Sequence, residues 1–128
     1  MVYAPLLVYC GLLGGTGMLA GAYGAHGLKT EDAHERLAFV AAAQHQVLHS
    51  VAALASVTLA EVLRPSKPAA ARRMTAAASL FLFGITVSAG TRYALSFGAP
   101  PRLRRLGPLG GLTATTGWFC AAFAALAL

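Results

Sequence analysis

The sequence predicts an all-α polytopic membrane protein, a four-transmembrane-helix bundle that forms a single domain over residues 1–128. Apolar residues make up 57% of the chain and charged residues only 11%, whereas soluble domains carry about 25% charged residues. Four apolar segments each approach the roughly 20 residues that cross a bilayer as a helix. Alanine and leucine dominate these segments without strand-like alternation, so we expect helices and not a membrane β-barrel.

The four apolar segments cover, in order, residues 3–24, 37–63, 74–98 and 108–128. The first has no basic residue before it and is longer than the apolar part of a usual secretory signal. We therefore expect it to be a membrane span.

The connections between these segments contain residues that begin or end helices. Residues 26–36 form the only strongly mixed-charge stretch, and Thr30 or Asp32 is placed to cap the second helix. Residues 64–68 hold two prolines where a helix should stop. Residues 98–108 are basic and rich in proline, so we expect no helix there.

The basic residues are divided between the two ends of the predicted bundle. One end, shared with both termini, carries Arg64, Lys67, Arg72 and Arg73, and the other carries Lys29, Arg36, Arg102, Arg104 and Arg105. This even division does not set the orientation by the positive-inside rule. The net charge of +6 forms no continuous basic stripe, so nucleic-acid binding is not expected.

Positively charged loops beside apolar spans favour contact with anionic lipid headgroups. The predicted lipid-binding residues are Arg72, Arg73, Arg102, Arg104 and Arg105. Because they fall at opposite ends of the predicted bundle, two separate lipid sites are required.

Polar side chains within the spans are expected to face other helices. A helical projection of the second segment gathers small and polar residues on one side, namely Ala38, Ala42, His45, Gln46, His49, Ala52, Ala53 and Ser56. The predicted buried polar residues between helices are His26, His45, Gln46, His49, Arg92 and Tyr93.

Two of these positions have alternative interpretations. His45 and His49 are four residues apart, a spacing that can hold Zn or Cu where other ligands converge, but interhelical hydrogen bonding is preferred. Arg92 lies close to a segment end, so snorkelling toward the headgroups is favoured. Contact with a lipid phosphate or a neighbouring subunit, and a proton pathway, remain open for Arg92.

Glycines in the first and last spans allow close helix packing. They are Gly11, Gly14, Gly15, Gly17 and Gly21 in the first span, and Gly110, Gly111 and Gly117 in the last. We expect these residues to pack inside the bundle, with an intersubunit interface as the alternative.

No catalytic motif is present, so we predict that the chain is not an enzyme. It lacks a nucleophile elbow, a phosphate-binding loop, a dinucleotide fingerprint and a metalloprotease motif. Cys10 and Cys120 each lie in an apolar stretch without a second ligand nearby and are expected to be buried thiols. Neither a cofactor nor a metal site is predicted.

Several stretches, in this order along the chain, resemble the transmembrane protein 256 family, also described as domain of unknown function 423. They are Gly21-Ala-Tyr-Gly-Ala-His-Gly-Leu28, Gln46 with His49, Gly90 with Tyr93, Pro108-Leu-Gly-Gly-Leu112, and Gly117-Trp118. The resemblance implies a small polytopic helical protein of the mitochondrial inner membrane or a bacterial plasma membrane. It implies no catalytic residues, and it places His26, Gln46, His49 and Tyr93 in a polar interior.

Three functional hypotheses follow. The first is a non-catalytic structural or accessory subunit of a larger membrane complex, such as a mitochondrial respiratory-chain complex, with other membrane subunits as partners. The second is a membrane protein that binds an anionic lipid such as cardiolipin. The third is a small redox or transport protein that uses His26, His45, His49 and Arg92. No soluble small-molecule substrate is predicted.

Overall fold

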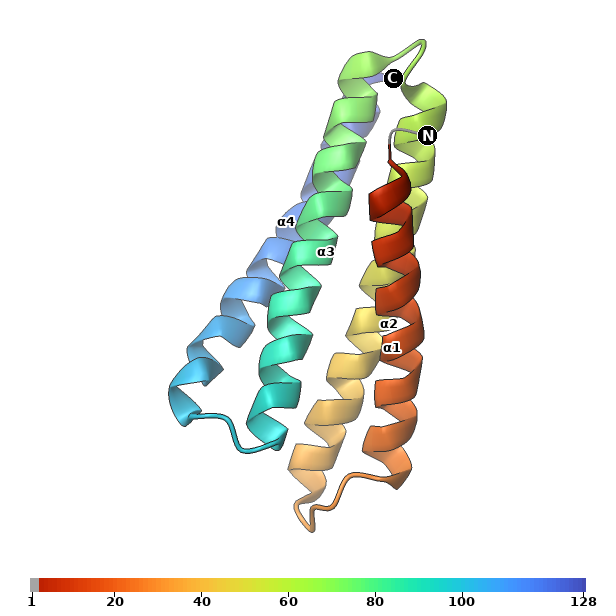
Figure 1. Ribbon diagram of the computed structural model, residues 1–128. Coiled ribbons are helices and arrows are strands. Elements are labelled where there is room, and N and C mark those ends of the chain that lie inside the picture. The colour runs from red at the N-terminus through yellow and green to blue at the C-terminus, as the bar shows by residue number, and fades with distance from the viewer. Residues whose placement is uncertain (1–2) are drawn as a thin grey trace.

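The computed structural model describes residues 3–128 and is helical almost throughout (Figure 1). Its long helices are α1 (Ala4–His26), α2 (Ala33–Leu63), α3 (Pro68–Ser96) and α4 (Leu106–Ala124). Two short 3₁₀ helices, η1 (Pro101–Arg105) and η2 (Ala125–Ala127), flank α4. Four helical stretches, the last of them running from Pro101 to Ala127, are long and apolar enough to cross a membrane. The predicted fold class, an all-α polytopic membrane protein, is confirmed.

The helices form two antiparallel hairpins, α1–α2 and α3–α4, joined where α2 packs on α3. The α1–α2 and α3–α4 connections lie at one end of the molecule, while both labelled termini and the α2–α3 turn lie at the other (Figure 1). We call these the crevice end and the terminal end. This arrangement agrees with the predicted division of the basic residues.

Three helix boundaries differ from the prediction because proline acts differently at a helix start than inside a helix. Pro68 begins α3, six residues earlier than expected, since proline is well suited to the first helical position. Pro101 begins η1, and Pro108 falls in the first turn of α4. The expectation of a non-helical segment over 98–108 was therefore wrong for residues 101–108, while residues 98–100 are not helical.

The α3–α4 seam is the tightest contact in the molecule. A Cβ atom added at Gly84 would lie 2.5 Å from the backbone nitrogen of Ala114, and one at Gly110 would lie 2.5 Å from that of Ser88. A Cβ atom added at Gly117 would lie 2.8 Å from the ring of Phe81. Only glycine permits backbones to approach this closely, so the predicted packing role of Gly110 is confirmed within the chain.

The α1–α2 seam uses glycine less tightly. A Cβ at Gly17 would lie 2.9 Å from the side chain of Val47, and one at Gly21 would lie 3.7 Å from Ala43. By contrast, Gly11, Gly15 and Gly111 would meet no atom within 4 Å, so the prediction that they pack inside the bundle was wrong for these three residues.

The buried face of α2 is rotated from the predicted one. Its buried residues are Phe39, Ala43, Gln46, Ser50, Ala53, Ser56, Val57 and Ala60. Large apolar side chains such as Leu48, Val51 and Leu54 are exposed on the opposite side, as expected for a surface that faces lipid.

Candidate functional site

A hydrogen-bonded group ties three helices together in the middle of the bundle. Gln46 of α2 is only 4% exposed. Its side-chain nitrogen donates to the backbone oxygen of Leu13 at 2.8 Å and to the hydroxyl of Thr16 at 2.9 Å, both in α1. The hydroxyl of Tyr93 in α3 donates to the Gln46 side-chain oxygen at 2.7 Å. The nitrogen and the oxygen of the Gln46 carboxamide are thus both paired, which fits a structural role for this residue.

His49 also has both ring nitrogens engaged. Its Nδ1 lies 2.8 Å from the backbone oxygen of His45, an acceptor, so Nδ1 must carry the proton. Its Nε2 then accepts from the indole N–H of Trp118 at 3.3 Å. The rings of His49, Trp118 and Phe81 pack together, with centroids 5.0 to 6.1 Å apart. This neutral tautomer directs no free lone pair toward a metal ion.

Two histidines do not occupy the predicted polar interior. His26 is the last residue of α1, and its side chain is exposed. His45 is also exposed, because it lies beside the buried stripe of α2 and not on it. Neither imidazole has a hydrogen-bond partner among residues 3–128, so the prediction of buried interhelical contacts was wrong for both.

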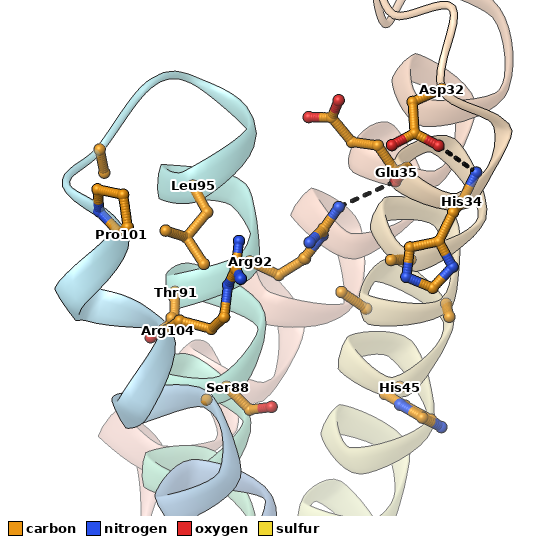
Figure 2. Close-up of a pocket in the computed structure, with 15 residues that line it drawn as sticks. Asp32, His34, Glu35, His45, Ser88, Thr91, Arg92, Leu95, Pro101 and Arg104 are labelled. Atoms are coloured by element: carbon orange, nitrogen blue, oxygen red, sulfur yellow. Dashed lines mark hydrogen bonds between the residues drawn. The ribbon is translucent and has the colours of Figure 1, made fainter.

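A crevice of about 820 Å³ lies between α2 and the α3–η1–α4 segment, shown in Figure 2. It begins at the α1–α2 and α3–α4 connections and extends along α2 from Asp32 to His45. At 1.5 Å per helical residue, this is about 20 Å from the membrane end toward the interior. Charged residues line its outer part, while its inner part is lined by Ala38, Ala41, Ala42, Ser88 and, at its inner limit, His45.

Two guanidinium groups extend into the crevice (Figure 2). Arg92 donates from one terminal nitrogen to the backbone oxygen of Glu35 at 3.2 Å, and its Nε is buried without a partner. This bond to the first turn of α2 fits the predicted snorkelling of Arg92 toward the bundle end. Arg104 of η1 has no hydrogen-bond partner within residues 3–128.

Two carboxylates line the outer part of the same crevice (Figure 2). Asp32 caps α2, accepting from the backbone nitrogen of His34 at 2.9 Å, which confirms its predicted capping role. Glu35 accepts from the hydroxyl of Thr30 at 2.8 Å through one carboxylate oxygen. Each carboxylate therefore keeps an oxygen that no described residue binds.

The predicted lipid-binding arginines have different environments. Arg104 lines the crevice, whereas Arg102 and Arg105 are exposed on η1 outside it. At the terminal end, Arg72 is exposed and Arg73 donates to the backbone oxygen of Phe123 at 2.8 Å. The structure thus brings Arg104 together with Arg92, which the sequence had placed in the polar interior, and not with Arg72 or Arg73.

Asp32 and Glu35 were not predicted as site residues. Asp32 was expected to cap the second helix, and Glu35 lies in its first turn, where the helix dipole favours an acidic residue. Their position opposite Arg92 and Arg104 depends on how α2 packs on α3, which no local motif encodes. The sequence did contain one signal for the site: Asp32, Glu35, Arg92 and Arg104 all fall at the same end of the predicted bundle.

The model of a protein family described as protein of unknown function (DUF423) matches residues 20–111. The chain belongs to this family, as the resemblance indicated. The matched region contains the Gln46–Tyr93 pair and the whole lining of the crevice. No solved structure matches the chain.

Proposed function

We propose that this protein is a non-catalytic membrane protein that binds the phosphate of a phospholipid headgroup through Arg92 and Arg104 in the crevice. The position of the two guanidinium groups supports this proposal most. Both line the same cavity at the crevice end of the bundle. Arginine binds phosphate oxygens through several planar N–H donors, and the exposed guanidinium of Arg104 has none of them engaged within residues 3–128.

The shape of the crevice also supports a lipid. Arg92 lies one helical turn before the end of α3, close to the end of a membrane span, where headgroups are expected. The inner part continues toward the membrane interior, and its three alanines offer an apolar surface to an acyl chain beside Ser88 and His45. The net charge of +6 favours anionic lipids around the protein as a whole.

Native mass spectrometry of the protein released from phosphatidylglycerol nanodiscs tests the proposal. Arg104→Gln should lower lipid retention by about threefold to tenfold, since it removes one charge-assisted contact. Arg102→Gln is the matched control, because Arg102 lies on the same 3₁₀ helix but outside the crevice. Equal retention by the two variants would refute the proposal.

A second candidate function is that of an accessory subunit of a larger membrane complex. Gly11 and Gly15 favour it: they are four residues apart on α1, exposed, and without an atom within 4 Å of their added Cβ positions. Small residues at this spacing let another helix approach closely. We expect Gly15→Leu to release the protein from a larger species on native gels, and Gly90→Leu, at another open position on α3, to leave it there.

The membrane that contains the protein is part of the same proposal. The family resemblance favours the mitochondrial inner membrane, where a respiratory-chain complex would be the assembly, with a bacterial plasma membrane as the alternative. The third hypothesis, a redox or transport role, has less support because both ring nitrogens of His49 are engaged. The exposed ring of His45 meets that of His49 only edge-on, and His26 lies at the end of α1.

A further inference from the structure

The crevice contains both signs of charge, yet its acidic and basic side chains do not pair with one another. Asp32 and Glu35 line it together with Arg92 and Arg104. Within residues 3–128 the only ion pair is Glu61–Arg64, at the terminal end. Arg92 binds the backbone oxygen of Glu35 and not its carboxylate.

Glu35 and Arg92 are half-buried and Asp32 and Arg104 are exposed, so the four charged groups are unpaired with one another and open to a ligand. A ligand that carries both charges can pair with both sets of side chains. Its anionic group meets the guanidinium groups, and its cationic group meets the carboxylates. Each carboxylate has an oxygen free to accept such a contact.

We propose, building on the proposed phosphate-binding function, that the crevice selects a phospholipid whose headgroup carries a primary amine beside its phosphate, as an ethanolamine headgroup does. The phosphate contacts Arg92 and Arg104, and the ammonium contacts Asp32 and Glu35. An ammonium has three N–H donors and pairs with carboxylates through charge-assisted hydrogen bonds.

The lining of the crevice distinguishes this headgroup from choline. A quaternary ammonium has no N–H donor and is typically recognised by the faces of Trp, Tyr or Phe. None of the described residues that line the crevice is Trp, Tyr or Phe. The chemistry of the lining therefore favours a primary amine.

The test compares lipid retention from nanodiscs that contain equal amounts of phosphatidylethanolamine, phosphatidylcholine and phosphatidylglycerol, measured by native mass spectrometry. The wild-type protein should retain the ethanolamine lipid about threefold to tenfold better than the choline lipid. The double variant Asp32→Asn, Glu35→Gln should lose this preference and keep its retention of phosphatidylglycerol.

Both substitutions preserve the local structure. Asparagine caps helices as well as aspartate does, and the glutamine that replaces Glu35 in this variant retains an oxygen for Thr30. Glu31→Gln is the matched control, because Glu31 is exposed in the same connection but does not line the crevice. Circular dichroism checks that each variant keeps its helix content.

The outcomes separate this inference from the proposed function. Equal retention of the ethanolamine and choline lipids, or a preference that survives in the double variant, overturns the inference while the dependence on Arg104 still stands. Loss of that dependence overturns both. Free phosphoethanolamine is added as a competitor: if it displaces the lipid at equal concentration, the site takes a soluble ligand and the lipid assignment is wrong.

Discussion

The two ends of the bundle carry the same net charge but use their cations differently. The crevice end has six basic and three acidic residues, and the terminal end has four basic and one acidic residue, so each end has a net charge of +3. At the terminal end Arg64 pairs with Glu61, Arg73 binds the oxygen of Phe123, and Lys67 contacts the oxygen of Leu128. Three of its four cations are bound within the chain.

At the crevice end the cations are mostly left for other partners. Arg36 donates to the backbone oxygens of Gly24 and Thr30 and so closes the α1–α2 connection, and Arg92 makes one backbone contact. The remaining cations, Lys29, Arg102, Arg104 and Arg105, have no hydrogen-bond partner among residues 3–128. Pairing within the chain, and not the number of charges, therefore distinguishes an end that stabilises the fold from one that can bind a ligand.

A substitution in the α3–α4 seam should reduce the stability of the bundle most. Gly110→Ala places a methyl group against the backbone of Ser88 and Gly84, which cannot move as a flexible side chain could. We expect a loss of stability of about 1 to 3 kcal/mol, as for other overpacked interfaces. Thermal unfolding in detergent measures it.

Gly111→Ala is the control for this variant. It adds the same methyl group at a neighbouring position that meets no atom within 4 Å, so it should leave the unfolding temperature unchanged or raise it. Equal destabilisation by the two variants would mean that the seam is not the tight contact described above.

A smaller effect is expected from the middle of the bundle, away from both ends. Gln46→Leu removes the hydrogen bonds to Leu13, Thr16 and Tyr93. Interhelical hydrogen bonds in membranes contribute about 0.6 kcal/mol on average and up to about 1.7, so we expect a loss of stability of about 1 to 2 kcal/mol by thermal unfolding.

Phospholipid retention gives a second test of Gln46→Leu. Because α1 contributes no residue to the crevice, Gln46→Leu should leave phospholipid retention unchanged. Gln44→Leu, on the exposed side of α2, is the matched control and should affect neither quantity. A variant that loses lipid together with stability would show that the crevice and the α1 contacts are coupled.

The sequence predicted the spans well because hydropathy and length reflect the bilayer directly. It also identified Gln46, His49 and Tyr93 as internal polar residues, since a polar group in a membrane helix must find a partner in protein. The rotation of α2 could not be predicted, because it depends on which neighbours pack on Ala43 and Ser50. The crevice was missed for the same reason: its lining comes from α2 and from the α3–η1–α4 segment, and only tertiary packing brings these together.

Replacing one cation at each end of the bundle should change stability least, and it tests whether the two ends use their cations differently. Arg73→Gln removes the charge-assisted hydrogen bond to Phe123, and because Arg73 is exposed we expect a loss of only about 1 kcal/mol. Arg104→Gln removes no contact within the chain and should not change the unfolding temperature. Lipid retention should show the reverse order, lowered by Arg104→Gln and unchanged by Arg73→Gln. If both substitutions lower stability equally, the cations of the two ends have the same structural role and the distinction between the ends is wrong.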